Sequence, residues 1–341
     1  MVQETEADRR IQALPRTRVA PLPTPLEEAS RLSEALGGPR ILFKRDDLTG
    51  FALGGNKVRK LEFIVGSAVA RGMDSLVVSG GLQSNMARIA AAMGRRLGLE
   101  VVLVLGGEPG ESRKPVGNLL LDRLYGASVQ TIYTVPRWEF GTAVEDAAEE
   151  LRRRGRRPYV VPLGGSSPEG IAGYLEATKE LAAQLAQRSI TPSRLYVPIG
   201  SGGTYTGLVL GAMNYRTSWQ VTGVSVSRTR EYLLEHIAAA AAAAADAFAF
   251  SKTPGSSDLC IEDSYVGPGY GSMTEGCREA ISVVARTEGV LLDPVYSGKA
   301  MYGLMDHIRR GLLGRQDTVV FLHTGGWPAL FAYEPATLGV D

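Results

Sequence analysis

Short apolar segments that end in paired glycines recur along this chain, and segments with helical periodicity separate them. Strands that are apolar on both faces and alternate with amphipathic helices are typical of a parallel sheet covered on both sides. The sequence therefore predicts an α/β fold with open, parallel-type sheets covered by helices. Four predicted strands end in glycine pairs, at 75–81, 101–107, 158–165 and 317–326, and further strands lie at 41–44, 128–133 and 219–226.

The periodic segments between these strands are predicted to be helices. Alanine is the best helix former, so the eight alanines at 238–245 indicate a surface helix rather than disorder or a membrane insert. Residues 1–12 are polar and are expected to fray, and residues 250–263 are expected to form a loop. Other predicted helices lie at 26–36, from Lys57 onward, and at 85–97, 118–124, 142–154, 168–187 and 274–287.

Composition narrows the class of protein. The 341 residues are enough for two domains, and the 37 basic and 36 acidic residues nearly cancel. This balance gives no reason to expect a nucleic-acid or membrane partner. Cys260 and Cys277 form no CxxC motif and the chain has three histidines, so we expect free thiols and no metal site. The polar N-terminus does not resemble a signal peptide, which indicates a cytoplasmic protein.

The segment GGNK at 54–57 places a lysine directly after a tight turn. Paired glycines let the backbone approach a ligand and take positive φ, and Asn56 suits a turn or a helix N-cap. A lysine held in a partly dry pocket loses proton affinity and can act as an amine nucleophile. Lys57 is therefore a candidate catalytic residue, although the segment also fits a solvated lysine in the basic KVRK cluster.

Two glycine-rich turns between a strand and a helix are candidate anion sites, because backbone N–H groups and the helix dipole bind anions there. The turn GSGGT lacks both the GK[ST] of a Walker loop and the acidic residue of a dinucleotide fingerprint, so a monophosphate fits it best. The turn GGLQSN carries Ser84 and Asn85 and suits a carboxylate, although an ordinary helix cap also explains it. The GSGGT turn consists of Gly200, Ser201, Gly202, Gly203 and Thr204.

A reactive lysine, a monophosphate site and a carboxylate site on one α/β scaffold fit pyridoxal 5′-phosphate acting on an amino acid. The ordered motifs GGNKVRKLEF, GGLQSNMAR, VPLGGSSPEGIAGYLEA, VPIGSGGTYTGL, LLDPVYSGKAMYGL and VFLHTGGWPALFAY resemble the D-cysteine desulfhydrase and 1-aminocyclopropane-1-carboxylate deaminase family. The resemblance spans residues 22–333. It implies the tryptophan-synthase-β-like architecture, fold type II, with a large cofactor-binding domain at 1–57 and 167–341 and a small domain at 58–166.

The resemblance also implies a role for each site residue. Lys57 would hold the cofactor as a Schiff base and later move protons at Cα, and Asn85 would hydrogen-bond the cofactor's phenolic oxygen. The GSGGT turn would hold the phosphate, and Ser84 would bind the substrate carboxylate. Tyr270 and Tyr296 would line the substrate side as catalytic residues, although each also fits a core aromatic with a satisfied hydroxyl. Ser297 and Thr324 would lie at the pyridine nitrogen, and Asn85, Met86 and Ser167 would contact the substrate with Ser84.

One departure from the family pattern bears on the reaction. Deaminases of this family carry a glutamate directly after the DPVY tyrosine, where its carboxylate keeps the pyridine ring protonated, and this chain has Ser297 there. A hydroxyl cannot supply that charge, and opening a cyclopropane needs strong carbanion stabilisation. We therefore expect the desulfhydrase branch: β-elimination from a small, D-cysteine-like, sulfur-containing amino acid, giving pyruvate and ammonia.

Two further departures leave the substrate open. Desulfhydrase-like members usually have histidine at the position of Met86 and asparagine at that of Ser167. Met86 removes a hydrogen-bond donor and a titratable group, so a bulkier or less polar β-substituted alanine also fits. The cyclopropane deaminase is the alternative enzyme, and a degenerate protein that binds cofactor or amino acid without turnover is the alternative outside enzymes. The expected partners are a small amino-acid substrate and a second copy in a homodimer.

Overall fold

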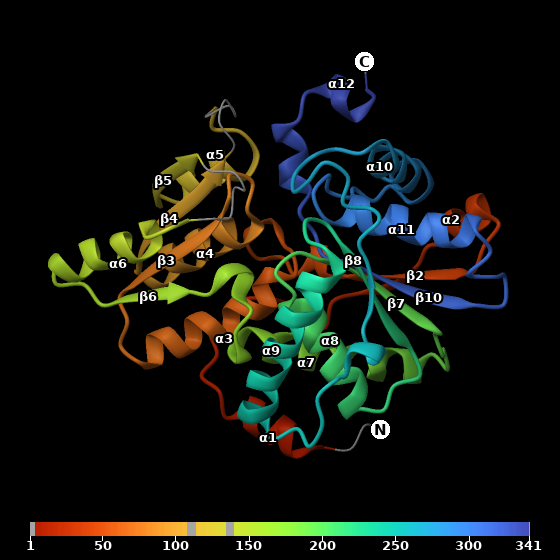
Figure 1. Cartoon of the computed structure of the whole chain (residues 1–341), viewed down its shortest axis with the longest axis horizontal. Coiled ribbons are helices and arrows are strands. Elements are labelled where there is room, and N and C mark those ends of the chain that lie inside the picture. The colour runs from red at the N-terminus through yellow and green to blue at the C-terminus, as the bar shows by residue number, and fades with distance from the viewer. Residues whose placement is uncertain (1–3, 108–113, 134–139, 341) are drawn as a thin grey trace.

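The computed structural model describes residues 4–107, 114–133 and 140–340. Within these ranges the chain forms two sheets, each with helices on both faces (Figure 1). Neighbouring strands are parallel throughout, except that β1 pairs antiparallel with β2. The predicted α/β class with parallel-type open sheets is confirmed.

The two sheets use different parts of the chain. The four-stranded sheet has the order β5-β4-β3-β6 and the six-stranded sheet the order β1-β2-β10-β7-β8-β9. The smaller sheet lies within the predicted small domain, whose boundaries stay a prediction. The strands are β1 (Leu26–Glu28), β2 (Arg40–Arg45), β3 (Ser75–Gly81), β4 (Glu100–Gly107), β5 (Ser128–Tyr133), β6 (Pro158–Val161), β7 (Arg194–Ile199), β8 (Gln220–Ser225), β9 (Cys260–Glu262) and β10 (Thr318–His323).

Helices connect the strands as the alternating pattern predicts. They are α1 (Glu6–Gln12), α2 (Ser30–Leu36), α3 (Lys57–Ala70), α4 (Asn85–Leu97), α5 (Gly117–Leu124), α6 (Ala143–Arg153), α7 (Pro168–Gln187), α8 (Gly203–Asn214), α9 (Arg230–Phe248), α10 (Glu275–Glu288), α11 (Ser297–Arg309) and α12 (Pro335–Leu338). Short 3₁₀ turns are η1 (Asp46–Leu48), η2 (Phe51–Leu53), η3 (Leu163–Gly165), η4 (Ser256–Asp258) and η5 (Trp327–Ala332). In the described residues, no helix is long and apolar enough to cross a membrane.

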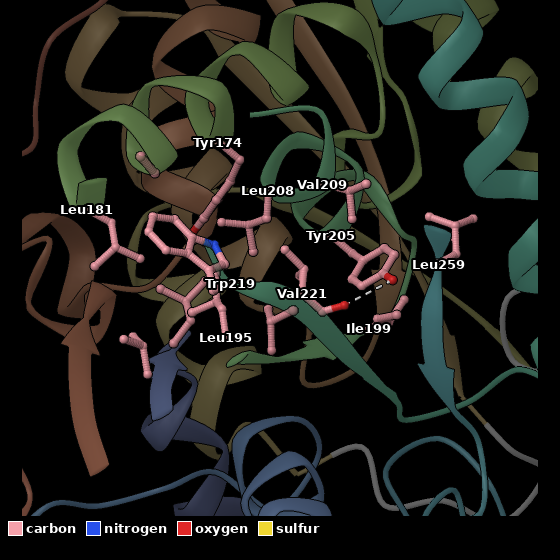
Figure 2. Close-up of a cluster of buried hydrophobic side chains, with 14 of the residues drawn as sticks. Tyr174, Leu181, Leu195, Ile199, Tyr205, Leu208, Val209, Trp219, Val221 and Leu259 are labelled. Atoms are coloured by element: carbon pink, nitrogen blue, oxygen red, sulfur yellow. Dashed lines mark hydrogen bonds between the residues drawn. The ribbon is translucent and has the colours of Figure 1, made fainter. Parts of the chain in front are cut away.

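Alternate residues of the central strands enter cores on opposite faces of the six-stranded sheet. Leu195 and Ile199 of β7 pack with Tyr205 of α8 on the face that α7, α8 and α9 cover (Figure 2). Tyr196 of the same strand packs on the other face with α2, α10 and α11. Because side chains alternate along a strand, a sheet buried on both sides needs strands that are continuously apolar. The apolar runs in the sequence follow directly from this burial.

The four-stranded sheet is buried in the same way. Val78 of β3 joins a core with α3 and α4, whereas its neighbour Val77 joins a second core with Leu151 of α6. Glycines end β3 and β4, and their strands reach the same edge of the sheet. Ligands of open α/β sheets bind outside this carboxyl edge.

The structure corrects several predicted elements. Residues expected to fray form α1, because Thr5 and Asp8 cap it reciprocally and Ile11 is buried with Phe248. The first three residues of the predicted helix 26–36 are instead strand β1, which extends the six-stranded sheet at its edge. Contacts with distant residues decide both cases, and local periodicity does not report them.

Other differences concern the ends of strands. The predicted strand 158–165 stops at Val161, and its glycine pair lies in η3. The predicted loop 250–263 contains η4 and β9, which pairs parallel with β8. The strand predicted at 317–326 ends at His323, because Gly325 and Gly326 take positive φ.

Candidate active site

Lys57 lies at the N-terminus of α3, directly after a turn that only glycine can form. Gly54 has φ +69°, and a Cβ there would lie 1.9 Å from the Asp47 carbonyl oxygen. Of the two roles predicted for Asn56, it forms the turn and not a side-chain cap, because its backbone is already helical and no cap hydrogen bond forms. Its Nδ2 instead donates to Thr204 Oγ1 at 3.1 Å. Asn56 thereby ties the lysine turn to the glycine-rich turn after β7.

Two lysines of α3 converge on one carbonyl group. Lys57 Nζ donates to the Gly164 oxygen at 3.3 Å and Lys60 Nζ donates to the same oxygen at 2.7 Å. Burial lowers the pKa of Lys57 to about 8. Burial, followed by the charge of Lys57, lowers the pKa of Lys60 well below its usual value. Neither lysine has an ion pair with a carboxylate in the described residues, so the pair favours an anionic ligand.

The glycine-rich turn at 200–204 follows β7 and opens α8. Gly202 has φ +87°. A Cβ on Gly203 would lie 2.7 Å from Lys60 Nζ and 2.8 Å from Ser166 Oγ, so the bare backbone and the second lysine meet at this helix N-terminus. Ser166 Oγ accepts from Gly203 N and donates to the Ser201 carbonyl, which holds the turn in place. A helix N-terminus beside a buried lysine suits a phosphate group.

Two adjoining cavities open between the sheets at these turns. The smaller is lined by Asn56, Lys57, Asn85, Pro198, Ile199, Gly200, Ser201, Gly202, Thr204, Tyr205, Tyr296 and Thr324. The larger, of about 220 Å³, is lined by Lys57, Ser79, Gly80, Gly81, Ser84, Met86, Phe140, Pro162, Leu163, Gly164, Ser166, Gly200, Ser201, Ser227, Arg228, Tyr232, His236, Tyr270 and Tyr296.

The structure brings most of the predicted site residues to these cavities. Gly203 is part of the glycine-rich turn, but it lines neither cavity. Ser167 also lies outside both, because its hydroxyl caps α7 by accepting from Gly170 N. Its neighbour Ser166 lines the larger cavity instead.

The N-terminus of α4 supplies Ser84, Asn85 and Met86. Ser84 Oγ caps this helix by accepting from Ala87 N at 3.2 Å. Met86 is buried, and its methyl group would meet a Cβ on Gly165 at 2.6 Å, so it packs tightly below the larger cavity. The turn predicted to bind the substrate carboxylate is thus a helix N-terminus at the wall of the larger cavity, which Lys57 also lines.

Tyr270 and Tyr296 form a pair in the wall of the larger cavity. Their hydroxyl oxygens are 2.7 Å apart and their rings meet edge to face, with centroids 5.7 Å apart. Burial, followed by the neighbouring Tyr270, raises the pKa of Tyr296 well above its usual value. The Tyr296 hydroxyl therefore stays protonated, and the hydrogen-bonded pair can share or pass a proton near the lysine.

Ser297 is fully buried and lines neither cavity. Its Oγ donates to Asp293 Oδ1 at 2.6 Å and accepts from Asp293 N at 2.7 Å. Thr324, the other residue expected at the pyridine nitrogen, does line the smaller cavity. No aspartate or glutamate lines either cavity among residues 4–107, 114–133 and 140–340.

Comparison with known proteins identifies the class. Residues 18–325 match the model of a family described as pyridoxal-phosphate dependent enzymes. The chain belongs to this family. The predicted cofactor is thereby confirmed, and the two buried lysines and the helix N-terminus fit its aldehyde and phosphate groups.

Similar proteins agree with the predicted subfamily. A D-cysteine desulfhydrase of Salmonella choleraesuis is 40% identical over 94% of this chain and 97% of the relative. A putative 1-aminocyclopropane-1-carboxylate deaminase of Pyrococcus abyssi is 38% identical over 96% of both chains. A crystal structure described as an ACC deaminase homologue has TM-score 0.89 and 35% identity, covering 99% of each chain. Membership of the desulfhydrase and deaminase family is confirmed, and the identities do not separate its two activities.

A more distant structure shares the architecture. Threonine deaminase isoform 2 of Solanum lycopersicum has TM-score 0.64 at 17% identity, covering 94% of this chain and 84% of that chain. This likeness concerns the fold alone and agrees with the predicted fold type II.

Sequence reasoning missed several residues that the structure places at the site. Lys60 follows Lys57 by one helical turn, and this spacing could have indicated a second lysine on the same face. Ser166 carries no such signal, because only the packing of η3 against the 200–204 turn brings it there. The larger cavity is also lined by Arg228, which precedes α9, and by Tyr232 and His236 of its first two turns, a segment without a motif.

Proposed function

We propose that this protein is a β-eliminating lyase that acts on a small, D-cysteine-like, sulfur-containing amino acid and releases pyruvate and ammonia. One observation carries the choice within the family: no carboxylate lines the two cavities in the described residues. The Ser297 hydroxyl, which replaces the deaminases' glutamate, is bonded to Asp293. Without a carboxylate at the pyridine nitrogen the ring is a weaker electron sink, which disfavours opening a cyclopropane more than expelling a good leaving group.

The chain's own residues supply proton transfer and positioning. Lys57, with its pKa lowered to about 8 by burial, can remove the proton at the substrate Cα near neutral pH. When bound, the cofactor stabilises the electron pair left at Cα. The helix N-terminus at Ser84 and Asn85 suits the substrate carboxylate. The Tyr270 and Tyr296 hydroxyls stand where a leaving thiolate could take up a proton as the Cβ–S bond breaks.

The test is a panel of D- and L-cysteine, β-chloroalanine, cysteate, S-alkylcysteines and 1-aminocyclopropane-1-carboxylate, with detection of α-keto acid. We expect elimination from a D-cysteine-like substrate or β-chloro-D-alanine to exceed cyclopropane opening by about tenfold or more, which corresponds to at least 1.4 kcal/mol of activation free energy. Equal rates would favour the deaminase, which the 38% identical relative keeps as the second candidate.

A second measurement separates an enzyme from a degenerate binding protein. Borohydride reduction followed by peptide mapping should place the pyridoxyl group on Lys57. A group on Lys60 or Lys44, or none, would contradict the assignment of the catalytic lysine. Cofactor fixed on Lys57 without keto acid from any substrate would favour the binding protein. The homodimer stays a prediction, which sedimentation equilibrium tests.

A further inference from the structure

A chain of buried side chains lies beneath Asn85. Asn85 Oδ1 accepts from Asn118 Nδ2 at 3.0 Å, and Asn118 Oδ1 accepts from Arg88 Nη1 at 3.1 Å. Asn118 Nδ2 also donates to the backbone carbonyl oxygen of Gln83 at 2.8 Å. Arg88 and Asn118 are fully buried, and Asn85 is 8% exposed. The three side chains therefore form a relay from the interior to the cavity wall.

The chemistry of this relay determines which way each amide points. A guanidinium group can only donate hydrogen bonds, so the oxygen of Asn118 must face Arg88. The backbone carbonyl oxygen of Gln83 can only accept a hydrogen bond, which independently requires that the Asn118 nitrogen face the other side. That nitrogen donates to Asn85 Oδ1, so Asn85 Nδ2 must point away from the relay. Since Asn85 lines the cavity, and Nδ2 has no acceptor within the described residues, this donor is available to a ligand.

Arg88 also contacts the turn that carries the catalytic lysine. Its Nη2 donates to the Gly54 carbonyl oxygen at 2.7 Å. Burial lowers the pKa of Arg88 to about 10, so the group remains charged at neutral pH. Burial raises the pKa of the neighbouring Asp122 to about 8, so this carboxyl group is largely uncharged at neutral pH. One buried cation thus braces both Lys57's turn and, through Asn118, the Asn85 amide.

We propose that Arg88, acting through Asn118, holds the Asn85 amide with Nδ2 toward the cavity, where it donates to an oxygen of the bound cofactor. Asn118 is a positioning residue, since it contacts Asn85 and lines neither cavity. The inference rests on the proposed function, and on the contact with the cofactor's phenolic oxygen that the family resemblance implies for Asn85. It explains why a fully buried asparagine follows the Gly117 turn: it must accept from one partner and donate to two others, a combination that leucine or aspartate cannot provide.

The test is a double-mutant cycle on cofactor affinity, measured by titrating pyridoxal phosphate into the cofactor-free full chain. Asn118→Asp keeps the acceptor for Arg88 and removes the donor, so the Asn85 amide should turn its oxygen to the cavity. We expect affinity to fall by about tenfold or more in the chain that has Asn85 and by less than about twofold in an Asn85→Ala background. The absorption band of the bound cofactor should shift in the same direction in Asn118→Asp and Asn85→Ala.

Gln83→Ala is the matched control. The Gln83 side chain accepts from the backbone N–H of Asn118 and donates to the Val116 carbonyl, so its loss disturbs the start of α5 without entering the amide relay. Its effect on affinity should be the same in both backgrounds. Asn118→Ala, which removes donor and acceptor together, gives the same comparison if the aspartate variant does not fold.

Two results would overturn the relay: equal losses of affinity for the Asn118 variants in both backgrounds, or no loss in either. Failure of the proposed function looks different: the unmodified protein would then show no excess of elimination over cyclopropane opening in the keto-acid assay, or borohydride would not fix the cofactor on Lys57. The two failures are therefore distinguished before any variant is made.

Discussion

At the scale of single residues, burial of the lysine pair of α3 costs stability, and an anionic ligand such as the cofactor phosphate offsets this cost. Both ammonium groups lie near the Gly164 carbonyl, and the described residues give neither a carboxylate partner. Removing an ammonium from water without a counter-ion destabilises the charged form. The cofactor-free protein should therefore be less stable than the same fold without these buried charges. Binding of the cofactor phosphate should restore much of the lost stability.

We predict that Lys57→Met stabilises the cofactor-free protein at pH 7. Burial lowers the pKa of Lys57 from 10.5 to about 8, so between these values the unfolded chain binds more protons than the folded chain. Stability of the wild type should then rise with pH across this window. The methionine variant lacks this contribution, so its advantage in thermal unfolding should shrink between pH 8 and pH 10.5.

The control for this experiment is Lys252→Met, at an exposed lysine far from the cavities. It should change the unfolding temperature little at any pH. An advantage of Lys57→Met that is independent of pH would mean that better packing, rather than the loss of a buried charge, causes it.

At the scale of elements, the N-terminus of α8 depends on two glycines, which carry no side chain. Gly202 takes φ +87°, a conformation that other residues rarely adopt, and a Cβ there would also meet Ile237 Cγ1 at 3.2 Å. Gly203 leaves space that Lys60 and Ser166 approach closely. The approach of a phosphate to backbone N–H groups depends on this geometry.

We predict that Gly202→Val lowers cofactor affinity by about tenfold or more while the protein still folds, because relief of the strain, about 1–3 kcal/mol, moves backbone N–H groups of this turn away from the phosphate. Gly289→Val is the matched control: Gly289 ends α10 with φ +65° and has open space around it. Both variants should lose similar stability in urea unfolding, and only Gly202→Val should lose cofactor. Normal cofactor retention in Gly202→Val would contradict the phosphate role of the turn.

At the scale of the whole molecule, α3 joins the two sheets. Val58, Leu61 and Ile64 pack in the core of the four-stranded sheet, whereas Phe63 packs with α7 and α9. Arg59 of the same helix is buried and paired with Asp46, which follows β2, and with Glu180 of α7. A cavity between the sheets keeps its shape because one helix belongs to both cores.

We predict that Arg59→Met destabilises the protein by about 3–5 kcal/mol, because it leaves the buried Asp46 carboxylate without its ion-pair partner and removes one of the two cations that contact Glu180. Interaction with Arg59 holds the pKa of Asp46 and Glu180 below their usual values against burial. Their contribution is therefore present above the unfolded-state values near 4 and is lost as pH falls through the lowered folded-state values. Urea unfolding at pH 7 and at pH 3 checks both parts.

Arg152→Met is the comparison, since Arg152 forms exposed ion pairs with Glu145 and Glu149 on α6. It should cost little stability, because exposed ion pairs are screened by solvent. If the two arginine variants lose similar stability, the ion pairs of Arg59 with Asp46 and Glu180 do not hold α3 against the six-stranded sheet.

The sequence by itself determined the elements whose signals are local. Apolar strands, helix periods and glycine turns predicted the parallel sheets, the turn before Lys57 and the 200–204 turn, because backbone conformation and burial on two faces leave a mark on neighbouring residues. The order of motifs identified the family and the cofactor. The predictions of secondary structure were wrong at strand ends and at α1, β1 and β9, whose packing or pairing partners lie elsewhere in the chain.

Only the tertiary structure decided what surrounds these turns. It placed Ser166 rather than Ser167 at the cavity, turned the Ser297 hydroxyl toward Asp293, and brought Asn118 beneath Asn85. The Ser166 and Asn118 contacts have no periodic signature, because each depends on how one element packs against another, whereas the Ser297 contact depends on the conformation of the turn before α11. A hydrogen bond between side chains tens of residues apart is set by that packing, and sequence spacing carries no information about it.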